Sequence, residues 1–280
     1  MLLSLEFPGD EEFARLLARQ PEVDLTLVAL ELARDAYPQL DFQHTLDWLT
    51  RRGRELTDIA IKAPTDRVLL RNIGRCLSGT HGLHGDREAF HRPESSYLHR
   101  VIETGVGIPI SLSLVYIAAA QRAGIDMVGV ASPMHFLVRY DGADGTYFVD
   151  AFHQGRILSR ERCLRWLTQM TELPADDIDA MLEPARPREI VVRMLNNLKS
   201  LHIQQDDWES AWRVQRRLTA LQPMLFDQRR DLALVALKSN RLGLAVDLLT
   251  ACLKDSPDEE TTRFLRSHLH AAEHLLAEWN

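Results

Sequence analysis

A histidine and an aspartate stand on two neighbouring segments whose composition predicts β-strands. His135 opens a run rich in β-branched and aromatic residues, and Asp150 closes the next such run. If a four-residue loop joins the strands so that Tyr140 faces Gly145, paired positions sum to 285 and His135 lies directly across from Asp150. A carboxylate that orients an imidazole and raises its basicity is what a general base needs. We therefore treat this pair as candidate catalytic residues, against the alternative that the histidine is structural.

A helix predicted from Pro109 to Ala123 precedes these strands. Proline suits a first turn because its missing N–H would be unpaired there anyway, and Gly124 is a usual residue at a helix C-terminus. The segment is apolar almost all round, which predicts a buried helix. Its hydroxyl side chains, Ser111 and Ser113, are candidate nucleophiles, and in the alternative reading they bond back to helix carbonyls in a packed core.

The region before this helix divides into a helical part and a loop. Apolar residues recur near the 3.6-residue helical period from Asp10 to about Leu77. The stretch from Gly79 to Pro93 then breaks the pattern with glycines, and its potential metal ligands are His81, His84, His91 and Asp86. Because the glycines predict a flexible loop and no second ligand cluster is evident, we expect a solvated loop without a metal.

An internal repeat begins near Arg188, where a proline-containing connector ends. Residues recur 34 positions apart, as in Ala211 and Ala245 or Pro223 and Pro257, and this is the period of tetratricopeptide helix pairs. The small residue lets paired helices approach closely, and the proline ends the unit. We expect two such units and a final helix from Glu259 to Trp279, against the alternative of unrelated helical hairpins.

The composition excludes several classes of protein. Among 280 residues, 33 Lys and Arg stand against 40 Asp and Glu, and the net charge of −7 argues against a nucleic-acid partner. The three widely spaced cysteines, Cys76, Cys163 and Cys252, indicate no disulfide framework and predict a cytoplasmic protein. No signal-peptide pattern opens the chain, and its longest uncharged stretch, residues 104–121, contains Gly and Pro, so it predicts a core helix and not a membrane span.

Three segments also resemble the bacterial transglutaminase-like/tetratricopeptide proteins of the invasion-regulator SirB type. They are Ser95-Ser96-Tyr97-Leu98 through Gly107-Ile108-Pro109-Ile110-Ser111-Leu112-Ser113, then Pro133-Met134-His135-Phe136-Leu137-Val138-Arg139, and Phe148-Val149-Asp150-Ala151-Phe152. The resemblance spans about residues 40–260. It implies an α+β fold with a papain-like transglutaminase core, a central helix on an antiparallel sheet, at about residues 95–170. That core and a helical N-terminal extension make up residues 1–188, and an all-α tetratricopeptide-like module makes up residues 189–280.

The resemblance assigns His135 and Asp150 to the family's histidine and aspartate but leaves the nucleophile open. Active relatives place a cysteine at the start of the central helix, about fifteen residues before the glycine that ends it, and Pro109 holds that position here. A thiol at a helix N-terminus reacts because its pKa is lowered, and proline offers no such group. Ser113 lies one turn further along the same face, whereas Ser111 is rotated by about 200°, so Ser113 is the better substitute.

These observations favour a non-catalytic transglutaminase-like protein. We expect it to be cytoplasmic, to have a regulatory role and to bind a protein or peptide through the repeat module, with no cofactor, metal, nucleic acid or membrane. The alternative is a serine-dependent hydrolase or acyltransferase that uses Ser113, with His135 as base and Asp150 as the orienting group. A third hypothesis is a regulator whose vestigial cleft senses a small molecule.

Overall fold

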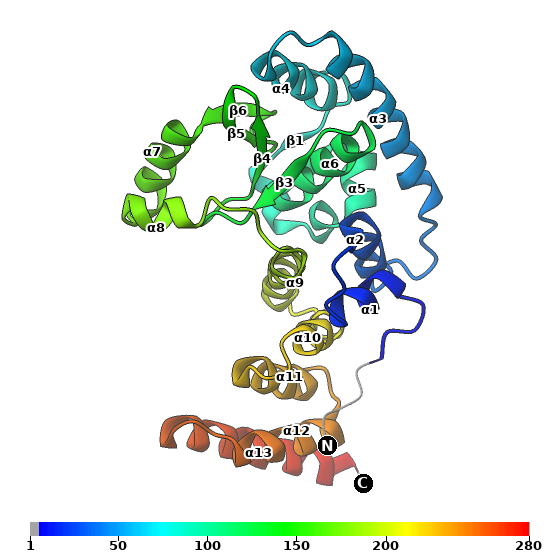
Figure 1. Cartoon of the computed structure of the whole chain (residues 1–280). Helices are drawn as coiled ribbons and strands as arrows, with labels where there is room; N and C mark the ends of the chain where they lie inside the picture. Colours follow the sequence, from blue (N-terminus) through cyan, green and yellow to red (C-terminus); the bar gives the residue numbers. More distant parts are fainter. Residues whose placement is uncertain (1–5, 280) are drawn as a thin grey trace. The chain divides into compact units, whose positions relative to one another are not determined.

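The computed structural model describes residues 6–279, which form two compact units. One unit contains residues 20–194, and in the other residues 6–19 join residues 195–279 (Figure 1). The boundary expected near Arg188 falls inside helix α9 (Pro187–Gln204), which contributes to both units. Helix α1 (Glu11–Leu17) groups with the C-terminal helices, although the sequence placed it with the core. The first five residues, on which the expectation about a signal peptide partly rests, lie outside the described range.

The unit of residues 20–194 contains a four-stranded antiparallel sheet in the order β3-β4-β5-β6. The strands are β3 (Met127–Val130), β4 (Leu137–Gly142), β5 (Gly145–Asp150) and β6 (Arg156–Ser159). The predicted register is wrong by two residues: Gly142 pairs with Gly145 across a two-residue turn, so paired positions sum to 287 and His135 precedes β4. A two-residue shift leaves every side chain on its predicted face, because side chains alternate with a period of two.

Short elements fill two places where the sequence predicted none. Strand β6 adds the fourth strand, in a segment that we had expected to lead directly into helix. The predicted loop of residues 79–93 begins inside a π-helix and continues through a short strand and 3₁₀ turns. These elements are η1 (Arg75–Thr80), β1 (His84–Gly85), η2 (Arg87–His91) and η3 (Pro93–Ser96), with β1 paired in parallel to β2 (Val106–Gly107).

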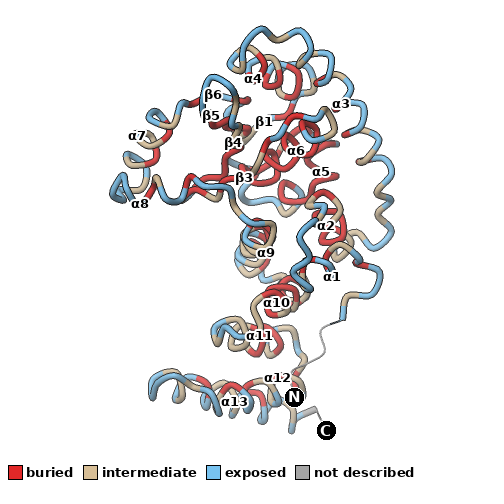
Figure 2. The backbone as a smooth tube through the Cα atoms, in the orientation of Figure 1, coloured by how far each residue is buried: buried red, intermediate tan, exposed pale blue. Residues whose placement is uncertain are grey.

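Helix α6 (Pro109–Arg122) is the central helix of this unit, and it starts where the sequence predicted. Every residue from Pro109 to Ala120 is buried (Figure 2). Helix α3 (Gln43–Lys62) crosses α6 closely, since a Cβ atom at Gly53 would lie 2.6 Å from the Cβ atom of Arg122. The other helices of the unit are α2 (Leu25–Ala33), α3 (Gln43–Lys62), α4 (Asp66–Gly74), α5 (Leu98–Thr104), α7 (Arg160–Thr171) and α8 (Ala175–Ala180).

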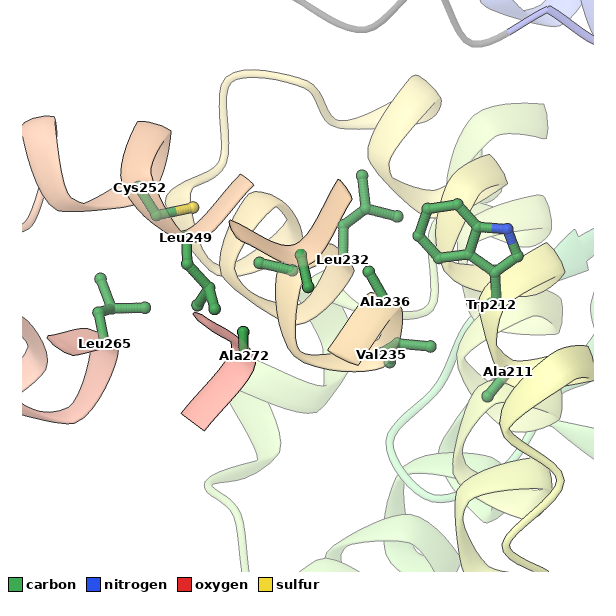
Figure 3. Close-up of a cluster of buried hydrophobic side chains, with 11 residues drawn as sticks. Ala211, Trp212, Leu232, Val235, Ala236, Leu249, Cys252, Leu265 and Ala272 are labelled. Atoms are coloured by element: carbon green, nitrogen blue, oxygen red, sulfur yellow. The ribbon is translucent and has the colours of Figure 1, made fainter. Parts of the chain in front are cut away.

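The second unit is a stack of helices with the predicted period. Helices α10 (Trp208–Leu221) and α12 (Leu242–Lys254) begin 34 residues apart, α11 (Phe226–Lys238) lies between them in the chain, and α13 (Glu259–Trp279) follows. Ala211 and Ala245 are fully buried in a core that these helices share. Figure 3 shows part of this core, with Ala211 next to Trp212. The small side chains therefore lie at helix contacts, as the repeat pattern requires. Together the two units confirm the predicted α+β core followed by an all-α module.

A buried ion pair joins the N-terminal segment to helix α10 within the second unit. Arg217 donates to Asp10 Oδ2 at 2.7 Å, and both side chains are almost completely buried. The Arg217 guanidinium also lies over the rings of Phe7 and Phe13, at 4.7 and 4.8 Å from their centroids. The cation is thus enclosed by a carboxylate and two aromatic faces, which explains why α1 belongs to this unit.

Candidate functional site

His135 and Asp150 form a hydrogen-bonded pair in the interior of the core unit. His135 Nε2 lies 2.9 Å from Asp150 Oδ1, and the two side chains are 6% and 0% exposed. Asp150 is the last residue of β5, and His135 belongs to the loop between β3 and β4. The sequence predicted this pairing, and the structure shows that it survives the change of register.

Asp150 is surrounded by hydrogen-bond donors. Besides His135, it accepts from the His153 backbone N–H at 3.2 Å, from His153 Nδ1 at 2.7 Å and from the Arg156 guanidinium at 3.3 Å. Burial alone would raise the pKa of the Asp150 carboxyl, but the hydrogen bonds and electrostatic interactions with His135 and His153 outweigh it and leave the pKa below its ordinary value. The carboxylate is therefore ionised at neutral pH.

The charge of Asp150 decides which nitrogen of His135 can act as a base. An ionised carboxylate only accepts hydrogen bonds, so His135 Nε2 must carry the proton that it donates to Asp150. In the neutral ring, Nδ1 then holds the lone pair. The pair is therefore oriented so that Nδ1 can take a proton from a nucleophile placed beside it.

Arg193, in the first part of α9, fixes the backbone of the loop that carries His135. Its guanidinium donates to the carbonyl oxygens of Ser132 at 2.7 Å and of His135 at 2.8 Å. The Ser132 hydroxyl donates to the same His135 carbonyl at 2.9 Å. Burial lowers the pKa of Arg193 from its ordinary value, yet an arginine stays charged at any physiological pH. Arg193 is thus a positioning residue for the imidazole.

Aromatic side chains enclose the ring of His135 on several sides. Trp166 of α7 meets it edge to face with centroids 5.1 Å apart, and His153 stacks on it at 5.9 Å. Trp166 also lines a pocket of about 370 Å³, and the Arg156 guanidinium lies 4.5 Å from its ring centroid at the same pocket. The pair therefore sits beside a concave surface with basic and aromatic walls.

The two candidate serines both make hydrogen bonds with backbone groups. The Ser113 hydroxyl, fully buried, donates to the carbonyl oxygen of Phe136 at 3.4 Å. The Ser111 hydroxyl donates to the carbonyl oxygen of Ser95 at 2.6 Å and accepts from the Ile108 backbone N–H at 3.1 Å. Within the described residues, neither hydroxyl bonds to the His135 ring. Pro109 occupies the first turn of α6, where the resemblance expects the cysteine.

The three cysteines are buried and are held as neutral thiols. Burial raises the pKa of Cys163 to about 12 and, together with a hydrogen bond to Glu55, raises that of Cys76 to about 11. Burial also raises the pKa of Cys252, which lies in the helical unit. A reactive cysteine needs a lowered pKa, so none of the three has the electrostatics of a nucleophile.

Two groups of described residues have the spacing of metal ligands. One is His135, Asp150 and His153, and the other is Glu55, Cys76 and His81. In the first group, the two ring nitrogens that face Asp150 donate protons to it, so an ion would have to displace those protons. Of the loop residues considered as ligands, only His81 joins such a group; His84 Nδ1 contacts the Gly82 carbonyl oxygen at 2.8 Å, and Asp86 accepts from the Glu88 backbone N–H at 3.1 Å.

Sequence reasoning missed His153, Arg156, Trp166 and Arg193. His153 lies in the turn between β5 and β6, where Gln154 and Gly155 adopt positive φ angles of 56° and 76°, and Arg156 is the first residue of β6. The only sequence signal was the spacing of three between Asp150 and His153. Arg193 reaches the site from 58 residues away in the chain, a contact that no local pattern announces.

Comparison with known proteins decides the family of the core unit. Residues 41–196 match the family described as the transglutaminase-like superfamily, and residues 198–270 match the tetratricopeptide repeat. This chain belongs to the transglutaminase-like superfamily. The transglutaminase-like match covers the sheet, α6 and the His135–Asp150 pair, and the repeat match covers α10 to α12 with parts of α9 and α13.

Two bacterial relatives match this transglutaminase-like chain over most of its length, and a mammalian one matches a shorter part. It is 34% identical over 258 residues to a UPF0162 protein of Xylella fastidiosa, which covers 88% of each chain. It is 21% identical over 256 residues to the UPF0162 protein YchA of Escherichia coli, covering 91% of this chain and 94% of YchA. F-box only protein 21 of Homo sapiens is 30% identical over 125 residues, which is 42% of this chain and 19% of that protein.

Proposed function

We propose that this chain is a non-catalytic transglutaminase-like protein of the SirB type that acts by binding a protein or peptide. The main support for this proposal is that, among the described residues, no nucleophile is in place beside the base His135. Pro109 starts α6, the Ser113 hydroxyl donates to a backbone carbonyl, and the cysteines have raised pKa values. A tetratricopeptide stack offers an extended surface that suits a peptide or helix.

Two other parts of the proposal concern role and location. We propose a regulatory role, because a protein that binds without reacting changes only the state or availability of its partner. We also propose a cytoplasmic location, for which the support is that all three cysteines are unpaired. In the described residues, no helix combines the length and the apolar character needed to cross a membrane.

The intact base pair favours a second candidate, a serine-dependent hydrolase or acyltransferase. His135 Nδ1 has the lone pair that a nucleophile would need, and Ser113 lies on the face of α6 that contacts the backbone next to His135, at Phe136. Rotation of the Ser113 side chain away from the Phe136 carbonyl would be required for it to reach the imidazole.

One experiment separates the two candidates. The full chain is incubated with a serine-directed fluorophosphonate probe and, separately, with glutamine- and lysine-containing peptides, alongside Ser113→Ala and His135→Ala. We expect no covalent adduct and no amide cleavage or cross-linking. Labelling of Ser113 that disappears in both variants would establish the hydrolase and overturn the non-catalytic proposal.

The binding half of the proposal needs its own test. A photo-crosslinking residue replaces Phe264, which is 42% exposed on α13, and a matched control replaces Ile61, which is 77% exposed on α3. We expect a protein adduct from position 264 that excess unlabelled chain suppresses, and no such adduct from position 61. Equal adducts from both positions, or a specific adduct only from position 61, would contradict a partner site on the repeat module.

A further inference from the structure

Three arginines form a stripe on the surface of the core unit. Arg67, Arg71 and Arg75 follow one another at intervals of four residues on α4 and at the start of the π-helix η1. Four residues advance a helix by little more than one turn, so the three side chains lie on one face. They line a pocket of about 430 Å³ whose wall includes Ser78 and the turn at Gly155.

The stripe has no acidic counterpart. No carboxylate lines the pocket, and all three arginines are exposed without an ion pair to any described residue. Other arginines of the same unit are paired, such as Arg139 with Glu183 at 2.8 Å and Arg160 with Asp179 at 2.7 Å. Like charges at a spacing of four destabilise a helix by a few tenths of a kcal/mol per pair. The chain contains more acidic than basic residues, yet none of the acidic side chains that the structure describes pairs with this stripe to offset the repulsion.

Close backbone packing fixes the floor of the pocket. A Cβ atom at Gly155 would lie 2.8 Å from the Cα atom of Gly74, and Gly155 has a φ of 76°, so glycine is required there. This contact brings the turn after β5 against the end of α4. The pocket is therefore formed between two rigid segments and not by a single helix surface.

A neutral hydroxyl group completes the lining. The Ser78 hydroxyl lies 2.7 Å from the hydroxyl of Tyr116, which is fully buried in α6. Burial raises the pKa of Tyr116 to about 12, so the phenol keeps its proton at neutral pH. When Tyr116 donates to Ser78, the Ser78 O–H is left to donate into the pocket.

We propose that this pocket binds a small anion with clustered phosphate oxygens, such as a diphosphate group. Guanidinium groups form paired, charge-assisted hydrogen bonds to phosphate oxygens, and three of them on one stripe match two adjacent phosphates. The volume is that of a small-molecule site. The lining contains no aromatic side chain on which a base could stack and only one apolar side chain, Ile157, which disfavours a nucleic acid or a peptide side chain. The inference does not depend on the proposed function.

The test is calorimetric titration of the full chain with pyrophosphate. A parallel titration with sodium chloride at the same ionic strength is the salt control. We expect 1:1 binding that weakens about tenfold in Arg71→Gln and severalfold in Arg71→Lys, which keeps the charge but loses the paired geometry. The matched control is Arg54→Gln, another exposed and unpaired arginine of the same unit, which should bind as the unmodified chain does.

Three outcomes would overturn the proposal. They are no heat above that of the salt control, equal weakening in Arg54→Gln and Arg71→Gln, and tighter binding of an Asp- and Glu-rich peptide than of pyrophosphate through the same arginines. The last outcome would assign the pocket to an acidic peptide. Circular dichroism of each variant confirms that an exposed substitution has not altered the fold.

Discussion

Two groups of side chains in the core unit each join an imidazole to a carboxylate, but they arrange the links differently. In the first group, the buried Asp150 orients His135 and leaves Nδ1 of the ring with a lone pair. In the second, Glu55 stands between a thiol and an imidazole: Cys76 donates to Glu55 Oε2 at 3.4 Å, and His81 Nε2 lies 2.7 Å from the same oxygen. In the described part of the chain, the first group has a base but no nucleophile beside it. In the second group the thiol donates to a carboxylate and not to the imidazole.

The difference shows that the order of the hydrogen bonds matters more than the residue types. A thiol next to an imidazole loses its proton easily, whereas a thiol that donates to a carboxylate keeps it. Arg52 reinforces this order, because its guanidinium approaches His81 Nδ1 at 3.4 Å and can only donate. The second group therefore holds Cys76 in its neutral form in spite of the neighbouring histidine.

Loss of the central carboxylate should separate the two groups most strongly. We expect Asp150→Ala to lower the free energy of unfolding by about 3 kcal/mol, because it leaves the buried ring N–H of His135 without its acceptor. Glu55→Ala should cost less than about 1 kcal/mol, because the Glu55 side chain is 42% exposed and its ion pairs are screened by solvent. Urea-induced unfolding of both variants measures the two losses. Equal losses would show that burial does not distinguish the groups.

A thiol placed beside the base should become reactive. We expect Pro109→Cys to react with iodoacetamide at neutral pH roughly a hundredfold faster than Cys76 does, because a helix N-terminus and an imidazole lower the pKa of a thiol. Peptide mapping by mass spectrometry gives both rates in one sample. His135→Ala in the same background should remove most of the gain, and a new cysteine as slow as Cys76 would mean that position 109 does not face the base.

Removal of the intervening carboxylate should loosen the proton on Cys76. Burial is the largest cause of the raised pKa of Cys76, and the hydrogen bond and charge of Glu55 add to it. We therefore expect Glu55→Gln to increase the alkylation rate of Cys76 about fivefold at mildly alkaline pH. Asp58→Asn, on the same helix but exposed, is the control that should leave the rate unchanged. An unchanged rate in Glu55→Gln would leave burial as the only cause.

Acid should weaken the fold through Asp150. Its pKa is lower in the folded chain than its ordinary value of 3.8, so its contribution to stability is complete above that value and is lost as the pH falls through the folded-state pKa. Between about pH 5 and about pH 3, the melting temperature of Asp150→Asn should therefore fall less than that of the unmodified chain. Scanning calorimetry at each pH checks this, and parallel declines would contradict the assigned ionisation.

Local signals in the sequence predicted more of the fold than of the site. Pro109 and Gly124 mark the start and the end of α6, because their backbone preferences act within a few residues. The repeat period correctly predicted that α12 begins 34 residues after α10. The hairpin was harder. The residues around Gly142 permit turns of two or four residues, and the choice shifts the pairing without changing the faces. Because the faces did not change, the predicted contact between His135 and Asp150 was correct although the predicted register was wrong.

What the sequence did not reveal depends on contacts across long distances in the chain. Strand β6 has four residues and an apolar content too low to stand out, and it forms because β5 is there to pair with it. Arg193 is an ordinary helix residue until the fold brings it to the carbonyl of His135. The assignment of α1 depended on Asp10 and Arg217, which no periodicity connects.

The pairing of Asp10 with Arg217 also has a consequence for the order in which the chain can fold during synthesis. These residues are 207 positions apart, so at a ribosomal speed of about 5–20 residues per second the acidic partner emerges roughly 10–40 s before the arginine. The earliest segment of the chain thus completes its packing among the latest, after the core between them has had time to form.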